Sequence, residues 1–296
     1  MPHLHLKRKR KLSSFRRMAL GTWQTPRDPQ AFGRIMVPMD ATRRYIAAYR
    51  EATGKHLTIT HLMAKVAAAI LVEYPDANAL LRFNRIYLRE EVSVFFQVAL
   101  RDPDTGQIDL SGVKIDAPHE KSLAAIIDEF EAHAKAVRDG TDPELEATRR
   151  AFLRVPNMLL GATFRVLDFL MFRLNLDLRW AGLPRDPYGA IMVTNVGSLG
   201  VEEAFAPIVP QSHVSIVVAV GEIHEAPLVK DGQVVVGEVM PLSATFDHRL
   251  LDGVHAANMV GLVKRWFADP FGHFDPIPGP AGGDPSAGDD AAQSLR

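Results

Sequence analysis

The sequence predicts an α+β domain in which a mixed β-sheet is flanked by helices. Two observations favour this class. Helical patterning dominates the first half of the chain, and short β-rich runs dominate the last third. The elements alternate without a regular βαβ order, and the 296 residues show no internal repeat. A chain of this length is sufficient to bury a sizeable core.

The first expected helix covers residues 41–53, with Asp40 as its cap and Gly54 at its end. The second covers 61–74 after Thr60, and its apolar residues recur at helical spacing. Two β-rich runs come next, followed by a helix that starts after a capping serine; these segments are 80–88, 92–100 and 123–137.

The pattern of residues 143–180 predicts an inserted helical hairpin that packs on the domain or on a neighbouring subunit. We do not expect 156–180 to contact a membrane, but an interfacial helix stays open as an alternative. The last third predicts strands, a tight Asp231-Gly232 turn and a final helix over 254–269. The expected strands are 190–196, 213–221, 226–229, 233–237 and 239–246.

The ends of the chain differ from the middle in composition. Residues 1–12 predict a flexible basic arm, and 271–296 predict a disordered tail rich in Pro, Gly and Asp. The domain itself is expected over 13–270.

Composition excludes several classes of function. The chain has no cysteine, which rules out disulfide scaffolds, thiolate metal sites and a cysteine nucleophile. The net charge of −1 gives no overall attraction to nucleic acid, and no nucleic-acid partner is expected. The histidine pairs His56/His61 and His3/His5 lack the spacing of a metal site, so no metal is expected. Without an apolar secretory segment, a cytoplasmic location is the expectation.

His248 is the strongest single candidate for catalysis. It lies between a strand that is expected to be buried and the last helix, where backbone groups can orient its ring. The pKa of an imidazole suits proton transfer near neutral pH. By itself, however, a histidine in such a place is more often structural.

The residues around His248 carry a more specific signal. The run Phe246–Gly253 (FDHRLLDG) closely resembles the signature of the dihydrolipoamide acyltransferases, the catalytic cores of 2-oxoacid dehydrogenase complexes. Val193–Val201 (VTNVGSLGV) resembles a second signature of that family, and Lys11–Arg17 resembles its first segment. The resemblance extends over about residues 11–270 and implies the fold of chloramphenicol acetyltransferase.

The resemblance also implies a reaction, which is acyl transfer between coenzyme A and a dihydrolipoyl group. His248 would take the proton from the attacking thiol. Thr194 stands where the family has a hydroxyl, usually serine, that stabilises the oxygen of the tetrahedral intermediate. Asp252 would keep the loop in shape through an ion pair with Arg16 or Arg17, between which the sequence does not choose. Asn195 and Gly253 would support the site.

The family forms its active site between subunits, so the resemblance implies an oligomer. We expect a stand-alone core without a lipoyl domain ahead of it, and a tail that differs from the helix that builds large shells. We therefore expect a homotrimer, with any lipoyl group supplied in trans by a lipoylated partner. Two alternatives stay open: a non-catalytic core that organises dehydrogenase subunits, or an acyltransferase with a non-thiol acceptor. The altered segment 108–113 leaves the specificity for acyl group and thiol undecided.

Overall fold

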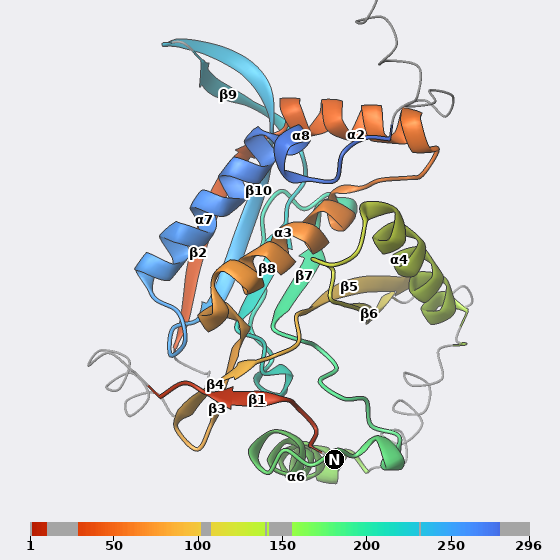
Figure 1. Ribbon diagram of the computed structural model, residues 1–296, viewed down its shortest axis with the longest axis vertical. Helices are drawn as coiled ribbons and strands as arrows, with labels where there is room; N and C mark the ends of the chain where they lie inside the picture. The colour runs from red at the N-terminus through yellow and green to blue at the C-terminus, as the bar shows by residue number, and fades with distance from the viewer. Residues whose placement is uncertain are drawn as a thin grey trace, which may run out of the picture.

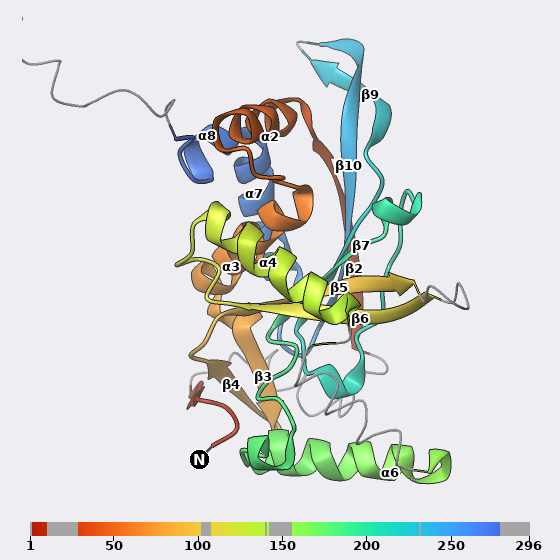
Figure 2. The same ribbon diagram turned by 90° about the vertical axis from the view of Figure 1, so that its right-hand side faces the viewer.

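The fold centres on one mixed β-sheet with helices packed on one face (Figures 1 and 2). The computed structural model describes residues 2–10, 29–101, 108–139, 141, 156–230 and 232–278. The strand order of the sheet is β2-β10-β8-β7-β5-β6, and β9 pairs with β10 as a projecting hairpin. Its strands are β2 (Gln30–Pro38), β5 (Ser93–Arg101), β6 (Ile108–Asp116), β7 (Ile191–Asn195), β8 (Ile216–Val220), β9 (His224–Lys230) and β10 (Gln233–Asp247).

The helices follow the expected patterning closely. The long helices are α2 (Asp40–Thr53), α3 (Ile59–Glu73), α4 (Leu123–Arg138), α6 (Asn157–Asp168) and α7 (Gly253–Ala268). The cap of α3 is Thr58 rather than Thr60, and Asp40 is the first residue of α2 rather than its cap. The short helices are η1 (Pro75–Asn78), the π-turn η2 (Phe169–Arg173), η3 (Arg179–Ala181), η4 (Gly197–Leu199), η5 (Pro210–Ser212) and α8 (Pro270–His273).

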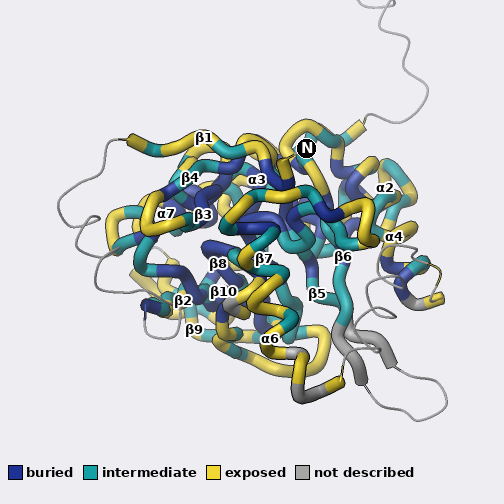
Figure 3. The backbone as a smooth tube through the Cα atoms, turned by 90° about the horizontal axis from the view of Figure 1, so that it is seen from below, coloured by how far each residue is buried: buried dark blue, intermediate teal, exposed yellow. Residues whose placement is uncertain are grey.

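The main core lies between the sheet and helices α3, α4 and α7, and the buried segments gather in the middle of the molecule (Figure 3). The middle residues of α3 are buried almost all round because the helix is covered by both neighbouring helices and the sheet. These contacts confirm the expected α+β class, with a mixed sheet flanked by helices.

Two predicted strand boundaries were wrong. Segment 80–88 forms a hairpin of β3 (Ala79–Arg82) and β4 (Arg85–Arg89), because Phe83 and Asn84 both adopt positive φ angles. The expected strands 233–237 and 239–246 are one continuous strand, β10, that joins the projecting hairpin to the centre of the sheet.

The described parts of both chain ends are folded, unlike the expected arm and tail. The strand β1 (Leu6–Arg8) pairs with β4, and Leu4 is buried. At the other end Phe274 is buried, and a carboxylate oxygen of Asp275 accepts the backbone N–H of Leu123 at 2.6 Å. Apolar burial and backbone pairing therefore attach residues 2–10 and 271–278 to the domain.

The described part of the insertion is helical. Met171 and Phe172 of η2 pack into a small cluster with Leu4 and Leu80, which docks α6 beside the β1-β4-β3 sheet. The other helix expected in this hairpin lies outside the described residues. Among the helices that are described, none is long and apolar enough to span a membrane.

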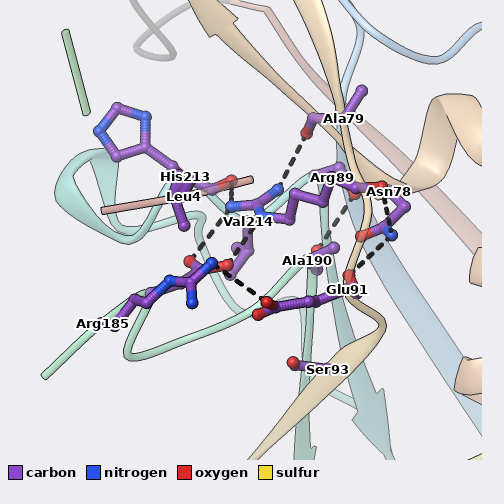
Figure 4. Close-up of polar contacts among 12 residues, drawn as sticks. Leu4, Asn78, Ala79, Arg89, Glu91, Ser93, Arg185, Ala190, His213 and Val214 are labelled. Atoms are coloured by element: carbon purple, nitrogen blue, oxygen red, sulfur yellow. Dashed lines mark hydrogen bonds and ion pairs between the residues drawn. The ribbon is translucent and has the colours of Figure 1, made fainter. Parts of the chain in front are cut away.

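A buried ion pair connects the small sheet to the loops that precede β7 and β8 (Figure 4). The guanidinium of Arg89 donates to Asp186 at 2.9 Å, and their side chains are only 3% and 11% exposed. Arg89 also donates to the backbone oxygens of Ala79 and His213, each at 3.2 Å. A buried guanidinium requires such partners, so this residue fixes three segments to one another.

Backbone packing fixes the loop that follows β7. Val196 N–H donates to Val220 O at 3.0 Å, and Glu222 N–H donates to Val201 O at 3.1 Å. A Cβ on Gly221 would lie 2.0 Å from Glu202 O, so only glycine fits there without a shift of the backbone. Gly197 is equally restricted by the backbone of Gly221, at 2.5 Å.

We predict that Gly221→Ala lowers the free energy of unfolding by about 1–3 kcal/mol, because the new methyl group forces two backbone segments apart. The matched control is Gly161→Ala on exposed α6, where a Cβ meets nothing within 4 Å. That variant should be neutral or more stable by up to about 1 kcal/mol. Urea unfolding of both variants measures the difference. Equal stability of the two would contradict the close packing.

Candidate active site

His248 lies in the turn that joins β10 to α7. The carbonyl of Asp247 accepts the N–H groups of Leu250 and Leu251 at 2.9 and 3.0 Å, which closes the turn directly after the strand. The N–H of His248 donates to Pro29 O at 2.7 Å. Backbone bonds on both sides therefore hold the position of the histidine.

The imidazole of His248 is oriented within the same turn. Its Nδ1 lies 2.6 Å from the carbonyl oxygen of Leu251. A carbonyl oxygen can only accept, so Nδ1 carries the proton in this contact. In the neutral ring, Nε2 then holds the lone pair and is the nitrogen that can take up a proton. An imidazole oriented in this way can act as a general base.

The residues that flank His248 form an ion pair that the sequence analysis did not assign. Arg249 donates to both carboxylate oxygens of Asp247, with the closest contact at 2.6 Å, and Asp247 is 5% exposed. A buried carboxylate needs such a partner. The only signal in the sequence was a cation two residues after an acid at the end of a buried strand.

Asp252 is the N-cap of α7. One carboxylate oxygen accepts the N–H groups of Val254 and His255 at 3.1 and 3.2 Å, and it also lies 2.6 Å from His255 Nδ1. The expected arginine partners, Arg16 and Arg17, lie outside the described residues. The structural role expected for Asp252 is therefore supported by its capping bonds, with His255 as an ionisable neighbour that the sequence analysis missed.

Thr194 and Asn195 end strand β7, and both are half-buried. Asn195 shapes the following turn, because its carbonyl accepts the hydroxyl of Ser198 at 2.7 Å and its Oδ1 accepts the Ser198 N–H at 3.2 Å. Gly253 is the first residue of α7, where a Cβ would meet nothing within 4 Å. Its position indicates no steric need for glycine.

Within one chain, Thr194 and His248 lie far apart. In the register of the sheet, Thr194 pairs with Ala219 on β8, and Ala219 pairs with Ser243 on β10. From Ser243 the chain runs on to His248, roughly 16 Å further at about 3.3 Å per residue. A base and an oxyanion donor must both reach the reacting atoms. One chain alone does not bring these two side chains together.

An apolar cavity of about 160 Å³ lies on the helical side of the sheet. Phe246, Met63 and Met259 line it together with other apolar residues of the sheet, α3 and α7. Arg34 is the only ionisable residue in its lining. The cavity therefore has no pair of groups for proton transfer.

Two of the other histidines that the sequence analysis considered, His61 and His3, are buried and have structural contacts. Burial lowers the pKa of His61 to about 4, so its ring is neutral at pH 7, where it accompanies Thr58 in capping α3. Burial likewise lowers the pKa of His3 to about 4. In the described part of the chain, no group of three or more His, Asp or Glu could hold a metal ion.

Comparison with known proteins agrees with the motifs. Residues 187–273 match the model of the 2-oxoacid dehydrogenases acyltransferase (catalytic domain) family. A Bacillus subtilis protein, the dihydrolipoyllysine-residue acetyltransferase component of the acetoin cleaving system, is 27% identical over 221 residues. This match covers 74% of the chain but only 44% of the relative.

Solved structures agree on the fold. A probable dihydrolipoamide acetyltransferase from Listeria monocytogenes superposes with a TM-score of 0.60 and 18% identity, covering 93% of this chain and 98% of the other. A dihydrolipoamide acetyltransferase from Azotobacter vinelandii gives 0.58 and 19%, covering 89% and 93%. Residues 187–273 are therefore similar to the catalytic domain of these acyltransferases, and the solved structures show that the chain shares their fold.

These comparisons confirm the expected resemblance to the acyltransferases and the expected fold. The matched region contains Thr194, His248 and Asp252, whereas the insertion at α6 lies outside it. The roles of the individual site residues remain predictions, as does the cytoplasmic location.

We predict that Asp252→Ala lowers the free energy of unfolding by about 1–2 kcal/mol, because α7 loses its capping acceptor. Asp252→Asn keeps an acceptor oxygen and should lower the free energy of unfolding by only about a few tenths of 1 kcal/mol. Thermal and urea unfolding of both variants provide the test. A fully stable Asp252→Ala variant that loses only catalytic rate would argue against a structural role.

Proposed function

We propose that this protein is an acyltransferase that moves an acyl group between coenzyme A and a dihydrolipoyl thiol, with His248 as general base. The observation that carries this proposal is the contact of His248 Nδ1 with Leu251 O, because it leaves Nε2 as the proton acceptor. The Bacillus subtilis relative is named for acetyl transfer to a dihydrolipoyllysine residue, which supports the choice of substrate.

The chemistry follows from the reactivity of thiols. A thiol with a pKa near 8.5 is mostly protonated at neutral pH and is a weak nucleophile in that form. His248 Nε2 takes the thiol proton, and the sulfur attacks the carbonyl carbon of the thioester. The tetrahedral intermediate then expels the second sulfur, which recovers the proton from His248. Atoms and charge balance without a metal or redox step.

The intermediate carries a negative oxygen that needs a hydrogen-bond donor. We assign this role to the hydroxyl of Thr194 from a neighbouring subunit. Support comes from the distance between Thr194 and His248 within one chain, which a second copy overcomes by placing its β7 end beside the turn. The proposed assembly is therefore a homotrimer with its active sites between subunits.

The relative from Azotobacter vinelandii gives a parallel for these residue types. A serine, a histidine and an asparagine have been investigated there for roles in the catalytic mechanism, the last two being four positions apart. His248 and Asp252 have the same spacing, and Thr194 supplies a hydroxyl as serine does. The proposed partners, a lipoylated protein and dehydrogenase subunits, follow from the same relationship.

We predict that His248→Ala lowers the rate of acyl transfer to dihydrolipoamide by roughly a hundredfold or more, because the base is lost. Acetyl-, propionyl- and succinyl-coenzyme A are offered in turn, and thiol consumption is followed. The matched control is His224→Ala, which removes a histidine at the start of β9 whose Nδ1 lies 3.0 Å from Glu222 O.

These assays test both the base and the acceptor of the proposed reaction. Retained activity in His248→Ala would exclude it as the base. A wild-type protein that binds coenzyme A but transfers no acyl group to dihydrolipoamide would contradict the thiol acceptor and favour another acceptor class.

A further inference from the structure

A chain of polar contacts runs from the end of β1 to the loop that carries His248. Lys9 forms an ion pair with Asp76 of η1. His255 Nε2 lies 3.4 Å from Asp76 Oδ2, and His255 Nδ1 lies 2.6 Å from Asp252 Oδ1. The four side chains are only 21–31% exposed, so solvent screens their charges incompletely.

We propose that His255 is a positioning residue for His248, held in turn by Asp76 and Lys9. The proposal rests on the function proposed above, in which His248 is the base. His255 does not reach the reacting atoms in this account. It acts through Asp252 and the peptide bond that precedes it.

The link between the two histidines is the peptide unit of Leu251 and Asp252. Its carbonyl oxygen is the group that orients the His248 ring. Its nitrogen belongs to Asp252, whose carboxylate lies 2.6 Å from His255 Nδ1. Because a peptide unit is planar, a contact that fixes Asp252 also fixes the direction of the Leu251 carbonyl.

Histidine is suited to this position because its two ring nitrogens point in different directions. Nδ1 reaches Asp252 on its own helix, while Nε2 reaches Asp76, 179 residues away in the sequence. Each ring nitrogen therefore contacts one carboxylate, so the ring connects the two acids, and Lys9 forms its ion pair with the second of them.

A purely structural role is the competing explanation, since His255 also belongs to the capping box of α7. The two roles differ in what they change. A cap affects stability alone, whereas a positioning residue affects kcat and the state of the His248 ring in a protein that remains folded.

The test compares His255→Ala, His255→Asn and Asp76→Asn, with His224→Ala as the control. Asparagine at 255 can still donate to Asp252 but is too short to reach Asp76. We expect His255→Ala to lower kcat roughly ten- to a hundredfold with little change in KM, because misplacement of a catalytic group acts on the chemical step. His255→Asn should recover part of this loss, and Asp76→Asn should show a smaller one.

A second readout does not depend on activity. Nitrogen-15 NMR of the His248 ring reports whether Nδ1 carries the proton, and this signal should weaken or broaden in His255→Ala. Urea unfolding verifies that each variant is folded. If the wild type transfers no acyl group, the proposed function fails, yet the ring signal still decides the positioning role. A folded His255→Ala variant with unchanged His248 signals would overturn the proposal, as would one with unchanged kcat.

Discussion

The register of β10 is the constraint on which the rest of the structure depends. This strand pairs with β2 and β8 within the sheet and with β9 in the projecting hairpin. Leu242, Ala244 and Phe246 face α3 and α7, and the strand ends at Asp247, where the turn that carries His248 begins. A slip of one residue would turn this apolar face away from the helices and would displace His248.

The same register separates the two chemical groups of the site. The parallel pairing of β7 with β8 places Thr194 toward the opposite end of the sheet from the β10–α7 turn. Backbone contacts hold each group in place: Thr194 pairs with Gln97 on β5 and Ala219 on β8, and His248 is held by its own turn. In the proposed function, these two groups act in one site only when two copies meet, and this is the physical argument for the proposed oligomer.

Local patterns in the sequence were sufficient for most helices and for His248. The helical spacing over α2, α3, α4 and α7 was clear, and the motif around His248 is contiguous. It was harder to predict that β10 is one continuous strand, because it contains Gly237 and Pro241, and these residue types usually interrupt strands. The N-terminal strand β1 was missed because the basic residues next to Leu4 and Leu6 indicated a solvated arm.

The parts of the site that could not be predicted depend on contacts between distant segments. The approach of His255 to Asp76 requires α7 to pack near η1, and no local pattern indicates it. The Asp247–Arg249 pair has a local signal, but neighbouring charges in a sequence rarely show whether they pair in the fold. The sequence therefore indicated the chemistry, and tertiary structure supplied the residues that hold it in place.

The most direct test of the account is complementation between two inactive variants. His248→Ala and Thr194→Ala proteins are unfolded together, refolded as a mixture and assayed for acyl transfer. The account predicts that random trimers regain about a quarter of the wild-type sites, because each site takes one group from each of two subunits. A mixture of His248→Ala with Asp252→Ala should gain no activity over the two variants assayed separately, since both residues belong to the same turn. Refolded mixed trimers without any activity would contradict a site shared by Thr194 and His248.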